Sequence, residues 1–309
     1  MSEIARIVQF PHPGPEHAPP GDLMMWNTSP GHKRKYLVSP GKTVDMSGAT
    51  TGEGELLFWG EWEPPSYIAH RWTRMAELPT VVHEPYWTSP GPPAGRQNTD
   101  PWVFGREFLY SNCKQATHTG GATALQELPA GSVILFGSTL ARRFVLDTVF
   151  VIAEVICRWS PADDPSVGGA AFRECTVRSL ASSELHATST FTLYRGATPE
   201  QPVEGMFSWV PCQRRTERGW PRFPRPSIVL MGIVNPRSQR SPSGAKIARP
   251  GDQVRQAWQA VAAQAEMQGL SLGCGIRTPQ RRKDPGGTDG DGSASCSVPS
   301  RTRVSASRC

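Results

Sequence analysis

The fold is decided by residues 144–156, which read FVLDTVFVIAEVI. In an extended chain both faces of this stretch are apolar, whereas a strand with one face in water alternates apolar and polar residues. The stretch therefore predicts a central strand covered on both sides, or two strands in sequence. Asp147 and Glu154 interrupt the apolar run, so it is too short and too charged to span a bilayer.

Shorter strands and two helices are expected around this central strand. Apolar patterns bounded by turn residues predict strands at residues 4–10, 55–59, 107–111, 132–138, 172–179, 189–194, 204–210 and 227–234. Apolar residues recur at helical spacing in residues 66–77, which Ser66 would cap, and in residues 252–267. Residues 18–54 and 85–105 are expected to be long loops.

Glycine and proline punctuate the chain throughout, with 30 of each in 309 residues. Such punctuation excludes a helical bundle, a coiled coil and a long solenoid. Residues 277–309 are almost free of apolar side chains and are expected to form a disordered basic tail. The prediction is an α+β fold with one β-dominated domain at residues 1–276. It would form a mixed sheet or a barrel-like domain, with a few helices and long Pro/Gly-rich loops.

The net charge of +6 is unevenly distributed. The tail has seven Lys/Arg and three Asp, which leaves +2 on the other 276 residues, so nucleic-acid binding would rest on local patches. The seven cysteines form no C-x-x-C pair and suit free thiols in a reducing compartment. No secretory signal is visible at the N-terminus. These features predict a cytoplasmic protein without membrane contact and without an evident obligate protein partner.

Four carboxylates are the candidate catalytic groups. Glu61 and Glu63 flank Trp62 at an expected strand-to-helix junction, and Asp100 precedes a proline. Asp147 lies among valines, where burial would raise its pKa toward that of a general acid or base. The alternatives are that the two glutamates are rim charges, that Asp100 caps a turn, and that Asp147 pairs with Arg142 or Arg143.

Aromatic and polar loop residues are the candidate substrate-binding groups. Tryptophan faces beside carboxylates suit the binding of a flat base or a sugar, although the alternative for any one tryptophan is core packing. His12, Glu16 and His17 could bind substrate or a metal, but satisfying their own Pro-rich loop is favoured over metal binding, and no metal site is expected. The full set is Trp26, Trp59, Trp62, Trp102, Asn98, His12, Glu16 and His17.

A third group of residues suits contact with DNA phosphates. Residues 214–225 carry five arginines interleaved with Trp220 and Phe223, a pattern typical of phosphate contact and base stacking, although a solvated loop would look the same. The candidate backbone contacts are Arg214, Arg215, Arg218, Arg222, Lys33 and Arg34.

Together these groups predict a pocket for a flipped base on double-stranded or locally opened DNA. A carboxylate, Asp100 or Glu61, would act at the sugar and cleave the base–sugar bond, with Trp62 and Trp102 as stacking walls and no cofactor. One alternative is a non-catalytic reader of modified bases. Another is a nuclease with a divalent ion held by Glu61, Glu63 and Asp100.

Three short sequence segments also resemble a known group of proteins. FPHPGPEH at residues 10–17, FWGEWEP at 58–64 and DPWVFG at 100–105 look like a bacterial family associated with nucleotide modification and phage conflict. Over residues 4–236 the chain is similar to anti-phage DNA glycosylases acting on glucosylated hydroxymethylcytosine. The resemblance implies this substrate and a role in antiviral defence. Residues 131–138 also resemble small β-barrel readers of the PUA, ASCH and EVE group.

Overall fold

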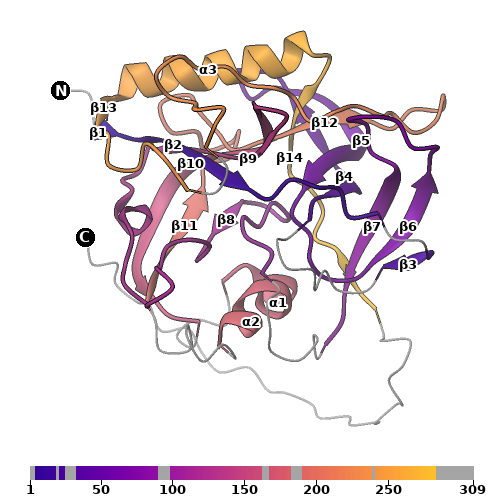
Figure 1. Ribbon diagram of the computed structural model, residues 1–309, viewed down its shortest axis with the longest axis horizontal. Coiled ribbons are helices and arrows are strands. Elements are labelled where there is room, and N and C mark those ends of the chain that lie inside the picture. The colour runs from indigo at the N-terminus through magenta and orange to yellow at the C-terminus, as the bar shows by residue number, and fades with distance from the viewer. Residues whose placement is uncertain are drawn as a thin grey trace.

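Two β-sheets form the body of the protein in the computed structural model (Figure 1). The structure describes residues 4–18, 21–24, 33–89, 98–161, 167–181, 190–238 and 241–282. Strands account for 43% of the described residues and helices for 14%, which confirms the β-dominated fold with mixed sheets and few helices.

The long strand β10 (Arg143–Trp159) is central to the first sheet, as residues 144–156 predict. It pairs antiparallel with β9 (Val133–Leu140) and with β11 (Phe191–Gly196). β2 (Ile7–His12) runs parallel to β9, and β8 (Leu109–Tyr110) runs antiparallel to β11. The order is therefore β2-β9-β10-β11-β8, and both faces of β10 are buried along its first half.

The second sheet has eight strands in the order β14-β12-β5-β4-β7-β6-β3, with β15 paired to β7. β4 pairs with β5 along its length, with β7 near its start and with β14 at its end, so β4, β5, β12 and β14 close a barrel-like ring. The bounds are β3 (Leu23–Met24), β4 (Lys35–Val44), β5 (Thr50–Gly60), β6 (Ser66–Arg71), β7 (Val81–Trp87), β12 (Val210–Arg214), β14 (Ser271–Cys274) and β15 (Gln280–Arg281). A separate pair joins β1 (Ile4–Ala5) to β13 (Arg249–Pro250).

One long helix, α3 (Gly251–Met267), lies across one end of the molecule (Figure 1) and confirms the helix expected at residues 252–267. Its apolar stripe, which includes Val254, Trp258 and Val261, packs into the core formed with both sheets. The shorter helices are η1 (Ala124–Glu127), α1 (Gly169–Phe172), η2 (Arg173–Val177) and α2 (Arg178–Ala181). Within the described residues, no helix is both long and apolar enough to cross a membrane.

Four secondary-structure predictions are wrong. Residues 204–210 have only isolated bridges at Met206 and Trp209 before β12 begins at Val210. Residues 66–71 form strand β6 instead of a helix, because pairing with β7 overrides the helical spacing, and Ser66 bonds His83 instead of capping a turn. Residues 172–179 are helical instead of extended. Residues 227–234 form no strand, and only Ser227 makes an isolated bridge.

Three boundaries also need correction. The expected loop at residues 18–54 contains β4 and the start of β5, and the expected loop at 85–105 begins inside β7. The basic tail does not begin at residue 277, since the Arg277 amide bonds Pro40 and β15 pairs with β7. Residues 283–309, the rest of the expected tail, lie outside the described residues.

A β-bulge sets the direction of the Asp147 side chain. Leu146 pairs with Gly137 and Thr148 pairs with Phe136, so Asp147 is the extra residue on β10. A bulge of this kind re-aims a side chain relative to the regular alternation. The bulge explains how a carboxylate within an apolar strand reaches the polar groups described below.

The close approach of the strands at this bulge requires a glycine at position 137. A Cβ there would lie 2.1 Å from the Val145 carbonyl oxygen and 2.8 Å from the Phe144 ring. Real Cβ atoms do not approach backbone oxygens so closely, so a larger residue would push β9 and β10 apart.

We expect Gly137→Ala to lower the free energy of unfolding by about 1–3 kcal/mol, because the strands must separate to admit the methyl group. Gly121→Ala is the matched control, since the nearest atom to its new Cβ is the Thr117 Oγ1 at 3.3 Å. The control should change stability by less than about 0.5 kcal/mol. Urea unfolding monitored by tryptophan fluorescence measures both, and equal stability of the two variants would contradict the analysis.

Candidate active site

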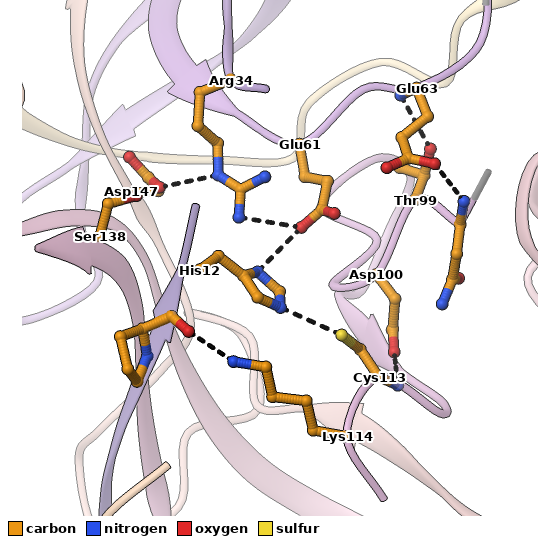
Figure 2. Close-up of polar contacts among 12 residues, drawn as sticks. His12, Arg34, Glu61, Glu63, Thr99, Asp100, Cys113, Lys114, Ser138 and Asp147 are labelled. Carbon is orange, nitrogen blue, oxygen red and sulfur yellow. Dashed lines mark hydrogen bonds and ion pairs between the residues drawn. The ribbon is translucent and has the colours of Figure 1, made fainter. Parts of the chain in front are cut away.

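Charged side chains from both sheets meet in one buried cluster (Figure 2). His12 is the last residue of β2, Arg34 precedes β4, Glu61 directly follows β5, and Asp147 lies at the bulge of β10. All four are at most 8% exposed. Burial of so many ionisable groups is costly unless they are paired, which makes the cluster a candidate functional site.

Arginines link the carboxylates of the two sheets. The Arg34 Nε lies 3.2 Å from the Asp147 Oδ2, and its Nη2 lies 3.2 Å from the Glu61 Oε2. On its other side, Asp147 is 3.5 Å from the Nη1 of Arg225, which also donates to the Ser138 hydroxyl at 2.9 Å. Two guanidinium groups therefore neutralise two carboxylates within the buried interior.

A histidine connects Glu61 to a cysteine. The His12 Nδ1 lies 3.1 Å from the Glu61 Oε2, and its Nε2 lies 3.0 Å from the Cys113 Sγ. Burial lowers the pKa of His12 to about 4, against the opposing effect of Glu61, so the imidazole is neutral at neutral pH. Cys113 is only half-buried, and burial together with Glu61 and Asp100 raises the pKa of its thiol well above the usual value.

Asp100 holds the loop that carries this cysteine. Its carboxylate accepts backbone N–H bonds from Ser111, Asn112 and Cys113 at 2.9, 2.9 and 2.7 Å. Complete burial raises the pKa of Asp100 to about 6, with Glu61 adding to the rise and the three N–H bonds opposing it. Asp100 therefore positions the loop, and its burial brings its pKa closer to neutral pH.

Glu63 and Lys35 are two further charged side chains that are completely buried. The backbone N–H of Asn98 donates to the Glu63 carboxylate, and the Glu63 N–H donates to the Thr99 hydroxyl at 3.3 Å. The Lys35 Nζ donates to the Pro64 carbonyl at 2.7 Å. Burial lowers the pKa of Lys35 to about 7, against the effect of Glu63.

The structure thus brings all four predicted catalytic carboxylates into one region. Glu61 and Asp147 share Arg34, while Asp100 and Glu63 anchor the adjoining loops. The glutamates are not rim charges, and Asp147 pairs with Arg34 and Arg225, not with Arg142 or Arg143.

The tryptophans predicted as stacking walls are placed differently. Trp62 and Trp102 are neighbours, with ring centroids 5.9 Å apart, but both are at most 1% exposed and pack in the core with Phe104. The Trp62 Nε1 donates to the Pro65 carbonyl. Because both rings are buried within the core of the described residues, their assignment as pocket walls is corrected.

Trp59, another of the predicted aromatic residues, borders a cavity. The cavity measures about 300 Å³, and the Arg225 guanidinium lies 5.1 Å from the Trp59 ring centroid. Because Arg225 also touches Asp147, this cavity adjoins the charged cluster. Trp26 lies outside the described residues.

The predicted polar substrate-binding residues have structural partners. The Glu16 carboxylate accepts from the Thr80 backbone at 2.6 Å and from its hydroxyl at 2.9 Å, so it fixes the start of β7. The His17 carbonyl contacts the His83 Nε2 at 2.8 Å. The Asn98 side chain pairs with that of Asn112 at the edge of the cluster. Glu16 therefore satisfies backbone groups of another segment, whereas His17 contributes only its carbonyl, and its buried ring Nε2 has no hydrogen-bond partner among the described residues.

The predicted phosphate contacts divide into buried and exposed residues. Arg34 is 2% exposed and belongs to the cluster, so its assignment to the DNA backbone is wrong. Arg215 pairs with Glu55 at 2.7 Å and stacks on Trp220, and Arg222 donates to the Pro79 and Thr73 carbonyls. Arg214 and Arg218 are exposed and Lys33 is half-buried. Contact of these three residues with DNA phosphates stays a prediction.

Three cluster residues escaped sequence reasoning. Cys113 was one of seven scattered cysteines, 101 positions from His12. Arg225 is the last arginine of residues 214–225. Its burial distinguishes it from the other arginines of that segment, and the sequence pattern does not show this burial. Lys114, whose Nζ donates to the Pro11 carbonyl, had no sequence signal. In the part of the chain that is described, no group of three or more His, Cys, Asp or Glu side chains could hold a metal ion.

Comparisons of the chain with known protein families, with curated proteins and with solved structures find no match. The site is therefore interpreted from its own geometry.

Replacing Asp147 with asparagine should destabilise the protein by about 3–5 kcal/mol, because the buried Arg225 loses its carboxylate contact and the buried Arg34 keeps only that with Glu61. Glu84→Gln is the matched control, since Glu84 pairs with Arg282 at the surface and is 53% exposed. Loss of that pair should cost less than about 1 kcal/mol. Chemical unfolding at pH 7 distinguishes the two variants, and a similarly small effect for Asp147→Asn would show that the network is not a stabilising link.

Proposed function

We propose that the protein is a DNA glycosylase that hydrolyses the bond between a modified cytosine and its sugar. The observation that carries the proposal is a pair of buried carboxylates in contrasting environments. Glu61 has the buried Arg34 guanidinium as its counter-charge, whereas burial raises the pKa of Asp100 to about 6. Two carboxylic groups in contrasting environments, one of them with a raised pKa, are what hydrolysis at an anomeric carbon requires.

Each group has a role that follows from its surroundings. Cleavage of the base–sugar bond builds positive charge on the sugar, which an ionised Glu61 would stabilise while it orients water. Protonated Asp100 would supply a proton as the base departs. His12, neutral and in contact with Glu61, would hold that carboxylate in place. In this mechanism Glu61 stabilises the positive charge on the sugar, and Asp100 is the general acid.

Binding would require a flipped nucleotide. A target base inside a duplex is out of reach, so glycosylases extrude it into a pocket. The cavity beside Trp59 and Arg225 offers an aromatic face, about 300 Å³ of space and a guanidinium shared with the cluster. Exposed Arg214 and Arg218 are available to phosphates. The preference for glucosylated hydroxymethylcytosine and the role in antiviral defence are supported only by the resemblance of three sequence segments, residues 10–17, 58–64 and 100–105, to anti-phage DNA glycosylases.

The second candidate is a non-catalytic reader of modified bases. It is favoured by the three backbone N–H bonds to Asp100, which give that carboxylate a structural role sufficient to explain its burial. Bases would then bind beside Trp59 without being excised.

DNA containing glucosylated hydroxymethylcytosine, incubated with the protein in EDTA and then treated with alkali, separates the candidates. Alkali-labile abasic sites that survive EDTA support the glycosylase. Cleavage that EDTA abolishes supports a divalent-metal nuclease, and retention of intact DNA supports the reader.

Glu61→Gln should lower the rate of abasic-site formation by about 10²-fold or more, because the amide cannot stabilise positive charge on the sugar. Glu266→Gln, on the exposed face of α3, is the matched control and should keep full activity. Thermal unfolding establishes that each variant is folded. Full activity of folded Glu61→Gln would contradict the assignment.

The rate should also fall as the pH rises through about 6, because Asp100 then loses the proton that the leaving base needs. Rates measured from pH 5 to pH 8 should show this loss in the wild-type protein. In folded Asp100→Asn the rate should be low and without the same descending limb. If the wild-type rate increases steadily from pH 5 to pH 8, a group other than Asp100 donates the proton to the leaving base.

A further inference from the structure

Lys114 places a primary amine at the half-exposed side of the cluster. It directly follows Cys113 in the loop that Asp100 anchors, and its Nζ donates to the carbonyl of Pro11, next to His12, at 2.5 Å (Figure 2). The Lys114 backbone has a φ of 60°, which lies in the left-handed region that is strained for a non-glycine residue. The fold thus holds a lysine in a conformation that a glycine or asparagine adopts more easily.

Burial favours the neutral, nucleophilic form of the Lys114 amine, whereas its contacts with the Pro11 carbonyl and the Phe10 ring also suit the ammonium form. Its Nζ lies 4.9 Å from the Phe10 ring centroid, and burial together with Arg34 lowers the pKa of the amine, against the opposing effects of Cys113 and Glu61. A desolvated lysine beside another cation is a common way to form a Schiff base with a carbonyl substrate.

Lys114 also borders a cavity by which a substrate could reach it. The cavity measures about 320 Å³ and is lined on its other sides by apolar residues, among them Leu125 and Ile247, and by the exposed Lys246. Lys35, the other buried lysine with a lowered pKa, is 0% exposed. Of these two amines, Lys114 is the accessible one.

We propose that Lys114 forms an imine with the aldehyde of an abasic deoxyribose, which gives the protein a β-lyase activity on abasic DNA. The inference rests on the proposed function in one respect. Excision of the base by a glycosylase leaves a sugar whose ring-opened form carries this aldehyde at C1′. The substrate class is an abasic site in DNA, whatever base was removed.

The chemistry balances without a further reactant. The amine adds to the C1′ aldehyde, and loss of one water gives the imine. A base, for which Glu61 is the nearby carboxylate, removes a proton from C2′. The electron pair forms the C2′=C3′ bond while the C3′–O bond breaks, and the 3′ phosphate leaves with the bonding pair. Water then hydrolyses the imine and restores the amine.

The test uses an oligonucleotide with a preformed abasic site, so that it does not depend on base excision. Borohydride reduces an imine to a stable amine, which links protein to DNA and is seen as a slower band in a denaturing gel. The wild-type protein should form this band, and peptide mapping should locate the adduct at Lys114. Lys114→Arg, which keeps the charge and lacks the primary amine, should reduce it at least about tenfold.

Lys42→Arg is the matched control, because Lys42 pairs with Glu53 at the surface, and it should trap as the wild type does. No wild-type adduct, an adduct at another lysine, or equal trapping by folded Lys114→Arg would overturn the proposal. Separate assays of base excision distinguish the two activities. Excision without trapping would reject the lyase alone, whereas trapping without excision would reject the glycosylase alone.

Discussion

The contact of Arg34 with Asp147 and Glu61 is the interaction on which the site depends. Asp147 belongs to the five-stranded sheet, and Glu61 follows a strand of the eight-stranded sheet, so one buried guanidinium joins the two sheets through charge. In a low-dielectric interior each member needs the others, because removing one leaves an uncompensated charge. The same contacts present Glu61 to His12, and through it to Cys113 and the loop of Lys114.

The geometry of this network is imposed by a few local features of the backbone. Gly137 lets β9 and β10 approach closely, and the bulge beside it turns Asp147 toward Arg34. On the opposite side, the Asp100 carboxylate gathers three backbone N–H groups and shapes the loop that ends in Cys113 and Lys114. Rigid strands and a pinned loop thus hold the acid groups in fixed positions, as catalysis by pre-organised charge requires.

The parts of the fold that could be predicted were those with strong local patterns. The apolar run of β10 and the apolar stripe of α3 are buried for the reason their periodicity suggests. Residues 66–71 were misread because Ile68 and Trp72 have helical spacing, whereas pairing with β7 decides the conformation. Trp62 and Trp102 were misread because their Pro/Gly-rich neighbours suggested exposed loops, yet these loops fold into the core.

The carboxylates were recognisable because acidic residues beside aromatic or apolar ones are unusual, and Asp147 among valines is the clearest case. Their partners were not recognisable, since the contacts of Arg34, Arg225 and Cys113 join segments about 80 to 110 positions apart. The most direct measurement of the central claim is mass spectrometry of the small molecules released from glucosylated DNA. The account predicts free modified base released by the wild-type protein, and release at least about 10²-fold slower by folded Glu61→Gln. Intact DNA with no released base, under conditions where the protein binds it, would contradict the account.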